Sequence, residues 1–196
     1  MSDKPILLVA TGNAGKLKEI KAILTDYCVK GAKEAGLNFD AEENGADFCD
    51  NAAIKATALK ALTDCAVLAD DSGLCVDVLD GAPGVYSARY AGEDASDGEN
   101  VDKLLQALAH VPDEERTARF RCSMCLIQEN GDMLFGEGAC EGKILFERSG
   151  DGGFGYDPIF YSFDLNEGFG TLSAEQKNSI SHRKRALEDL LLKLKK

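Results

Sequence analysis

The sequence predicts an α/β fold with a mixed central sheet flanked by helices, and three observations predict it. Short continuous apolar runs such as residues 6–10, ILLVA, are typical of buried strands. Stretches with helical hydrophobic spacing alternate with these runs along the chain. Asn130-Gly131, between two apolar segments, is a strong signal for a two-residue hairpin. Alternating strands and helices with a central hairpin favour this class over an all-α fold.

The first predicted strand, residues 6–10, leads directly into the loop Thr11-Gly12-Asn13-Ala14-Gly15-Lys16. Apolar residues then recur at helical spacing, which predicts a helix over 14–24 with one face toward the core. Residues 25–44 are mixed in character, and we expect one strand there between loops.

A second helix is expected over residues 46–62, where Lys55 interrupts an otherwise apolar stripe between Ala52 and Leu59. This spacing places the lysine on the buried face. Either its stem packs while the head group reaches water, or its ammonium points into a cleft to meet an anion. The spacing alone leaves both interpretations open.

The middle of the chain continues with a short strand over 66–70, which ends in Asp70-Asp71-Ser72-Gly73. Residues 74–79 alternate as a separate strand. A Gly/Pro-rich loop over 81–92 follows, and the apolar spacing over 101–108 predicts an amphipathic helix that ends before the next proline.

The central hairpin is predicted from an alternating strand over 117–128 and a return strand that begins at Met133. Residues 149–157, SGDGGFGYD, are rich in glycine, and such a loop lets a backbone approach a ligand closely. The apolar strand 158–161 leaves this loop. Ser173 and Gln176 have capping-box spacing, and a final helix packs through its leucines after the segment Ser181-His182-Arg183. The sequence has no internal repeat or linker, so we expect one domain over residues 1–196.

The charge balance limits the classes of partner. The 196 residues contain 34 acidic and 22 basic side chains, which gives a net charge of −12, and 44% of them are hydrophobic. An acidic surface repels the phosphate backbone, so binding to nucleic acid or to an anionic membrane surface is not expected. Small ligands in a local pocket remain possible.

The expected compartment is the cytoplasm. No apolar segment approaches the ~20 residues that span a bilayer, and the apolar part of the N-terminus is too short for a secretory signal. Seven cysteines, an odd number scattered through apolar stretches, predict reduced thiols. Cys122 and Cys125 form a CxxC pair within a predicted strand, where residues three apart face opposite sides, so a shared zinc ion is disfavoured.

The loop from Thr11 to Lys16 is suited to phosphate, because free backbone N–H groups and the positive end of a helix dipole face it. It does not have Walker A spacing, since only Asn13 and Ala14 separate its two glycines and Leu17 stands where a hydroxyl is needed. Taken alone, the pattern also fits an ordinary strand–helix turn with a solvated lysine.

Two acidic pairs, Glu42-Glu43 and Asp70-Asp71, are candidates for holding a cation. A triphosphate in an acidic protein needs a bridging ion, and Mg²⁺ is usually held by one or two carboxylates plus phosphate oxygens. Such carboxylates can also deprotonate an attacking water. Solvated loop acids are the simpler interpretation of Glu42-Glu43, and less so of Asp70-Asp71, which directly follow a buried strand. His182 with Arg183 could hold an anion or a purine edge, although a lone histidine is more often structural.

Nearly the whole chain, in order, resembles the inosine triphosphate pyrophosphatase family, whose members hydrolyse non-standard purine nucleoside triphosphates. The blocks that carry this resemblance are ATGNAGKLKEI, EENGADFCDNAAIKA, ADDSGLCVDVLDGAPGVYSARYAGEDA, GDGGFGYDPIF and LSAEQKNSISHRKRAL.

The resemblance implies that water attacks the α-phosphorus of ITP, dITP or XTP, with Mg²⁺ required, and releases pyrophosphate. Asp71 would be the proton acceptor and a metal ligand, and Glu42 the second metal ligand, with Glu43 as the alternative one position on. Ser72 would contact the substrate. Triphosphate binding is implied for Thr11, Gly12, Asn13, Ala14, Gly15, Lys16 and Lys55.

The resemblance also implies a base pocket and an assembly. Phe154 would stack on the purine and Asp157 would read its edge. The other implied contacts are Gly155, Tyr156, Lys177, His182 and Arg183. Hypoxanthine and xanthine carry a 6-oxo group where adenine has an amino donor, so cationic or N–H donors favour them. Family resemblance further implies a homodimer and a nucleotide cleft between two lobes.

Two other functions compete with hydrolysis. A non-hydrolytic purine nucleotide sensor would keep the pocket, but nothing in a sensor requires Asp70-Asp71 and Glu42 together with the lysines. A P-loop phosphotransferase is disfavoured by the glycine spacing.

Overall fold

A computed structural model describes residues 4–195 and confirms the α/β class. Its strands form a mixed sheet of seven strands in the order β2-β1-β3-β4-β5-β6-β7, with parallel pairs at the β2 end and antiparallel pairs at the β7 end. The chain divides into two compact units. The first unit comprises residues 4–71, Cys122–Gly138 and residues 183–195, and the second comprises Ser72–Arg121 and Ala139–His182.

The first unit contains most of the predicted N-terminal elements and the final helix. Its elements are β1 (Ile6–Val9), α1 (Ala14–Ile23), β2 (Cys28–Gly31), the 3₁₀ helix η1 (Lys33–Ala35), α2 (Phe48–Lys60) and, after its first residue, α5 (His182–Leu194). Three strands have residues in both units: β3 (Ala66–Val76), β4 (Thr117–Ile127) and β5 (Met133–Ile144). The predicted strand within 25–44 is β2.

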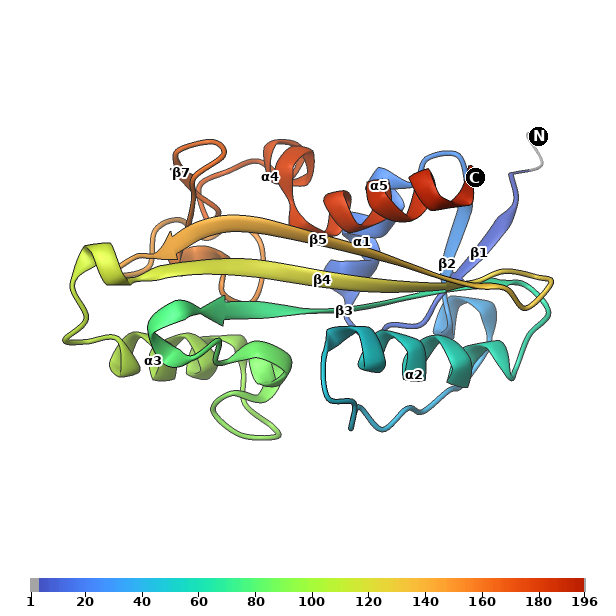
Figure 1. Cartoon of the computed structure of the whole chain (residues 1–196), viewed down its shortest axis with the longest axis horizontal. Helices are drawn as coiled ribbons and strands as arrows, with labels where there is room; N and C mark the ends of the chain where they lie inside the picture. Colours follow the sequence, from blue (N-terminus) through green and yellow to red (C-terminus); the bar gives the residue numbers. More distant parts are fainter. Residues whose placement is uncertain (1–3, 196) are drawn as a thin grey trace. The chain divides into compact units, whose positions relative to one another are not determined.

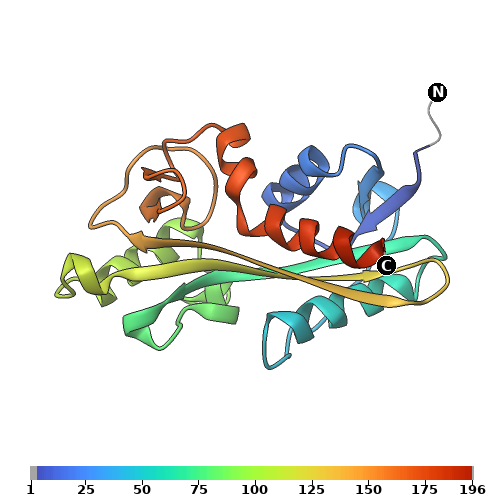
Figure 2. The ribbon, with the colours of Figure 1, turned by 45° about the horizontal axis from the view of Figure 1, so that its top comes forward.

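The two faces of the first unit's sheet carry different helices because side chains alternate along each strand. β1 pairs in parallel with β3, so that Val9 lies level with Leu68. Both residues pack with α1 and α5 on one face, while Ala69 packs with α2 on the other. Figures 1 and 2 show α1 and α5 together on one side of these strands and α2 on the opposite side. Cys122 and Cys125 likewise face opposite sides, as predicted.

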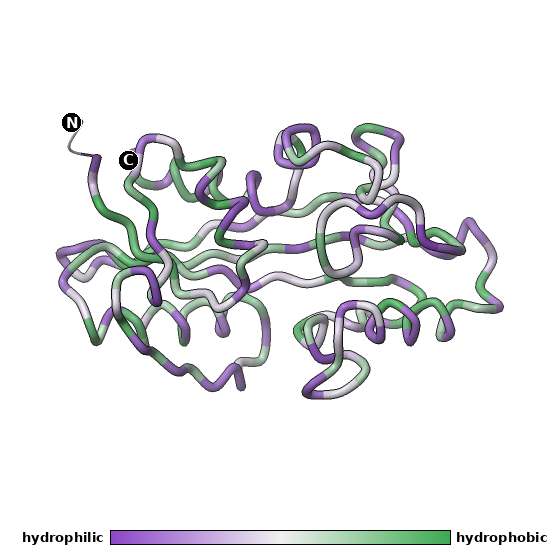
Figure 3. Tube along the Cα trace, turned by 180° about the vertical axis from the view of Figure 1, so that it is seen from behind, coloured by the Kyte–Doolittle hydropathy of each residue, from purple (hydrophilic) through white to green (hydrophobic). Residues whose placement is uncertain are grey.

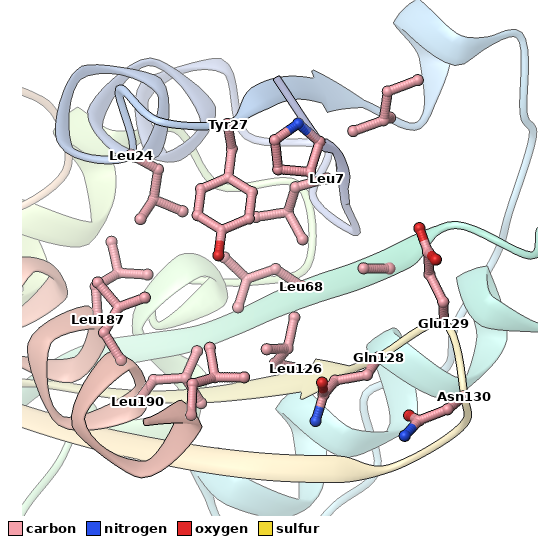
Figure 4. A pocket seen from close by; sticks show the side chains of 15 residues that line it. Leu7, Leu24, Tyr27, Leu68, Leu126, Gln128, Glu129, Asn130, Leu187 and Leu190 are labelled. Carbon is pink, nitrogen blue, oxygen red and sulfur yellow. The ribbon is translucent and has the colours of Figure 1, made fainter. Parts of the chain in front are cut away.

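An apolar pocket of about 400 Å³ lies on the α1 and α5 face of the first unit. Figure 4 shows leucine side chains from β1, β3, β4 and α5 around it, together with Leu24 directly after α1 and Tyr27, and the polar residues Gln128 and Asn130 near its edge. None of the residues predicted for a functional site lines this pocket. In the same unit, the connection between η1 and α2 is hydrophilic over most of its course (Figure 3).

The second unit has its own apolar core, formed by α3 against β3, β4 and β5. Leu104 of α3 and Leu74 of β3 are fully buried in it, as is Phe160. The other elements are η2 (Asp77–Leu79), η3 (Gly84–Arg89), α3 (Asp97–Ala107), η4 (Asp113–Glu115), η5 (Asp157–Ile159), β6 (Phe160–Ser162), β7 (Glu167–Gly168) and α4 (Ala174–Ile180). The capping box predicted at Ser173 and Gln176 is present at the start of α4.

Three details differ from the sequence prediction. The two strands expected over 66–70 and 74–79 are one continuous strand, β3, and residues 77–79 form a 3₁₀ helix instead. The two aspartates remain within β3 because each of them faces a cation. The strand expected over 158–161 begins only at Phe160, since Pro158 fixes its own backbone and belongs to η5. The loop expected over 81–92 contains the 3₁₀ helix η3.

Candidate active site

The loop between β1 and α1 is organised by its own side chains. Asn13 caps the ten-residue helix α1, because its Oδ1 accepts a hydrogen bond from the Lys16 backbone N–H at 3.0 Å. Thr11 Oγ1 accepts from the Asn13 N–H at 3.1 Å. Gly12 and Ala14 are exposed. The loop therefore presents a helix N-terminus, which favours anions, to solvent.

Lys55 lies on the buried face of α2, as the spacing predicted, and is 7% exposed. Its ammonium does not reach water in the manner of a snorkelling lysine, because it meets two carboxylates. Lys55 Nζ lies 2.7 Å from Asp71 Oδ1 and 3.1 Å from Glu43 Oε2. One helical turn earlier, Asn51 Nδ2 donates to Asp71 Oδ2 at 3.4 Å. α2 thus holds Asp71 from one side through two residues spaced by four.

The pKa values of both Asp71 and Lys55 lie above their usual range in this site. Burial raises the pKa of the Asp71 carboxyl, and the nearby negative charge of Glu43 adds to this, while Lys55 and Lys16 act against it. Burial also works against the charged form of Lys55, but the surrounding carboxylates, Asp71 foremost, outweigh it and raise the pKa of this ammonium. Asp71 is therefore a carboxyl group of raised pKa next to an ammonium whose pKa is also raised.

Asp70 points to the opposite face of β3, toward α1 and α5, and is fully buried. Its Oδ2 accepts hydrogen bonds from Arg183 Nε at 3.2 Å and Arg183 Nη2 at 3.1 Å, and Lys16 Nζ lies 3.4 Å from the same oxygen. Arg183 Nη1 also donates to Glu19 on α1. Burial alone raises the pKa of Asp70, but Lys16 and Arg183 outweigh it and hold this pKa well below its usual range.

A second group of predicted residues lies within the second unit. Asp157 Oδ2 accepts from the Phe154 backbone N–H at 2.8 Å and lies 2.5 Å from Lys177 Nζ. The same ammonium lies 4.6 Å from the centre of the Phe154 ring, which is a cation–π contact. Phe154 is half-buried, whereas Asp157 and Lys177 are buried. The half-buried Phe154 ring therefore packs against the ammonium of the buried Asp157–Lys177 ion pair.

The remaining predicted residues of the second unit have structural partners. The His182 ring stacks on Phe120, with ring centres 4.9 Å apart. Tyr156 Oη donates to the Ser87 carbonyl at 2.9 Å, and its ring belongs to the apolar core. The Gly155 N–H donates to Asp97 at 2.8 Å. Ser72 follows Asp71 in β3 and is half-buried.

The first unit thus brings together Lys16, Lys55 and Asp71 from three elements, and it places Glu43 with them. Glu42, the metal ligand expected first, is exposed, and its carbonyl accepts from the Asn44 N–H. Sequence reasoning missed Glu19 and Asn51. Their positions relative to the two lysines were the available signal: Glu19 comes three residues after Lys16 on α1, and Asn51 comes four residues before Lys55 on α2.

The carboxylates of the first unit fit a Mg²⁺ site that a substrate completes. Residues 4–195 contain no cluster of three or more His, Cys, Asp or Glu side chains that could hold a metal on their own. The carboxylates of Asp71 and Glu43 both form an ion pair with Lys55. Mg²⁺ is typically bound by one or two carboxylates together with substrate phosphates, so this donor set is compatible with the ion.

None of the helices in the described range combines the length and hydrophobicity needed to cross a membrane.

Comparisons with known proteins agree with this fold and identify the family. Residues 7–193 match the Ham1 family. The dITP/XTP pyrophosphatase of Desulforamulus reducens is 50% identical over 184 residues, which cover 93% of this chain and 92% of that protein. The dITP/XTP pyrophosphatase of Halalkalibacterium halodurans is 46% identical over 185 residues, 93% of this chain and 95% of that protein.

A solved structure is similar over the same span. The Staphylococcus aureus Ham1 protein aligns with a TM-score of 0.84 and 41% identity, covering 97% of this chain and all of that one. The fold defines the class, a mixed α/β protein with a seven-stranded sheet. The chain belongs to the Ham1 family, which confirms the resemblance seen in the sequence.

Proposed function

We propose that this protein hydrolyses the non-standard purine nucleoside triphosphates dITP, XTP and ITP to the monophosphate and pyrophosphate, and so removes them from the nucleotide pool. Relatives that are about half identical over nearly the whole chain are dITP/XTP pyrophosphatases. The observation that carries the proposal is the buried Asp71 carboxyl, whose pKa is raised and which Lys55 holds at 2.7 Å. A sensor without chemistry would not need such a group.

In this proposal the triphosphate binds the loop from Thr11 to Lys16, with Lys16 and Lys55 as cations. Asp71 accepts a proton from water as the water oxygen forms a bond to the α-phosphorus. The bond from the α-phosphorus to the bridging oxygen breaks, and pyrophosphate leaves with that oxygen and its electron pair. Lys55 fixes the direction of the Asp71 carboxylate and offsets its charge, which favours approach of an anionic substrate.

Asp71 and Glu43 are the residues that would hold Mg²⁺. Both glutamates are exposed, and Glu43 is preferred to Glu42 because its carboxylate shares Lys55 with Asp71. When bound, the ion would neutralise phosphate charge and polarise the phosphorus centre. Ser72, next along β3, is proposed to contact the phosphates.

Base recognition is assigned to the second unit. Phe154 would stack on the purine, and Lys177 beneath its ring and His182 would supply donors for the 6-oxo oxygen. Asp157 is proposed to support Phe154 and Lys177, because its Oδ2 accepts from the Phe154 N–H and pairs with the Lys177 ammonium. Tyr156 and Gly155 would shape the same loop. We also propose that residues 1–196 act as one functional domain in a cytoplasmic homodimer, as the resemblance and composition imply.

The experiment is an assay of products. Incubation with dITP or XTP and Mg²⁺ is expected to release pyrophosphate, and an excess of EDTA is expected to stop it. Release of orthophosphate instead would contradict the proposed bond cleavage. A rise in the unfolding temperature with dITP but no product would point to a nucleotide sensor.

A further inference from the structure

We propose that Arg183 is a positioning residue, which neutralises Asp70 and thereby leaves the ammonium of Lys16 available to a polyphosphate. The inference rests on the proposed function, since it assigns a role within the same phosphate site. It differs from the base contact that the family resemblance implies for Arg183.

Asp70 is directed to the face of β3 opposite to Asp71. Successive residues of β3 face opposite sides, so Asp70 faces α1 and α5 while Asp71 faces α2. Asp70 is 0% exposed. Two cations reach its Oδ2: the guanidinium of Arg183, through two hydrogen bonds of 3.1 and 3.2 Å, and Lys16 Nζ at 3.4 Å. Arg183 and Lys16 therefore share one carboxylate oxygen.

Two carboxylates fix the guanidinium of Arg183. Arg183 is 1% exposed, and its Nη1 donates to Glu19 while Nε and Nη2 donate to Asp70. Only the planar fork of an arginine presents donors in both directions at once. α1 supplies Lys16 and Glu19, one turn apart, so both ends of the arrangement belong to the helix that begins at the phosphate loop.

The charges of Arg183, its two carboxylate partners and Lys16 balance one another. Lys16, Asp70, Arg183 and Glu19 together carry no net charge. Without the guanidinium, two buried carboxylates would remain near the loop with Lys16 as their counter-ion. Lys16 would then be held by Asp70, and the excess negative charge would repel phosphate. Arg183 thus acts on phosphate through Asp70 and Lys16, without touching the ligand.

The test uses inorganic tripolyphosphate with Mg²⁺, because this probe has no base. Its affinity is measured by calorimetry for the full-length protein and its variants. Arg183→Met is expected to weaken binding by about tenfold or more, the scale on which loss of a supporting partner acts. Arg183→Lys should weaken tripolyphosphate binding by a smaller factor, since one ammonium cannot form hydrogen bonds with Asp70 and Glu19 together. Lys184→Met removes the same charge from the neighbouring, more exposed position, and it should stay within about twofold of the wild type.

The decisive comparison is made in a background that lacks both carboxylates, Glu19→Gln/Asp70→Asn. There Arg183 has neither of its two carboxylate partners to neutralise, so this background with and without Arg183→Met should bind tripolyphosphate equally. This comparison stands even where Arg183→Met alone fails to fold, because the triple variant buries neither carboxylate unpaired. A further loss in the triple variant would overturn the proposal, as would unchanged tripolyphosphate binding by Arg183→Met or Arg183→Lys together with lost preference for dITP over dATP. Tripolyphosphate binding without any pyrophosphate release by the wild type would refute the proposed function and leave this inference intact.

Discussion

Lys55 Nζ and Asp71 Oδ1 lie 2.7 Å apart, and both residues are buried in the first unit. The lysine comes from the inward face of α2 and the aspartate from the face of β3 that packs on this helix. A buried carboxylate next to a lysine is expensive to desolvate and stable only as a pair. This pair is the centre of the proposed chemistry, and it yields the first two predictions.

The substitution Asp71→Asn removes the proposed proton acceptor with little change of shape. We expect kcat for pyrophosphate release from dITP to fall by about 10²- to 10⁴-fold, the range of general base catalysis, while tripolyphosphate still binds. The measurement is steady-state kinetics with a pyrophosphate readout. Asp26→Asn, at an exposed position of the same unit, is the matched control and should retain wild-type turnover. Near-normal kcat in Asp71→Asn would remove Asp71 from this role.

The substitution Lys55→Met leaves Asp71 and Glu43 without their shared cation. We expect the free energy of unfolding to fall by about 3 kcal/mol, as for other broken buried pairs, and dITP turnover to be lost. Chemical denaturation measures the first effect. In Lys55→Met/Asp71→Asn the uncompensated charge is gone, so the double variant should be more stable than Lys55→Met. Simple addition of the two single losses would show that the residues are not coupled.

Glu42 and Glu43 are adjacent, and replacing each of them by glutamine tests which one binds Mg²⁺. Glu43→Gln is expected to raise the Mg²⁺ concentration needed for half-maximal activity by about tenfold, because a carboxylate ligand is lost. Glu42→Gln should leave it nearly unchanged, since it is Glu43 that pairs with the lysine holding Asp71. Mg²⁺ titration of initial rates decides between them, and the reverse order would restore Glu42 as the ligand.

Phe154 provides a test of base recognition in the second unit. Stacking of a base on an aromatic ring contributes about 1–3 kcal/mol, so Phe154→Ala should raise KM for dITP by about tenfold or more. The affinity for tripolyphosphate should not change. Phe163→Ala, at an exposed ring of the same unit, is the control for loss of an aromatic side chain. An equal loss of tripolyphosphate binding in Phe154→Ala would argue against a base contact.

Much of this site was predictable from residue patterns. The apolar spacing of α2 placed Lys55 on the buried face, because helical period and burial are local properties. The loop between β1 and α1 was recognisable for the same reason, and Asn13 proved to be its cap. The long sequence blocks are specific enough to identify the family by themselves.

The partners that join distant segments were not predictable. Arg183 follows Glu19 by 164 residues and Asp70 by 113, and no periodicity links them. The polar run at Asp70-Asp71 also hid the continuity of β3, because two charged residues are rare within a buried strand unless each meets a counter-ion. Only the tertiary fold supplies Arg183 and Lys16 to one aspartate and Lys55 to the other.

The central claim is that this protein selects non-standard purines and cleaves at the α-phosphorus. The most direct measurement ranks dITP, XTP, ITP, dATP and GTP by kcat/KM, with pyrophosphate detected as the product. We expect kcat/KM for dITP, XTP and ITP to be at least about a hundredfold above that for dATP, because dATP lacks the 6-oxo oxygen that the proposed donors would contact. Equal rates across the panel, or orthophosphate as the product, would contradict it.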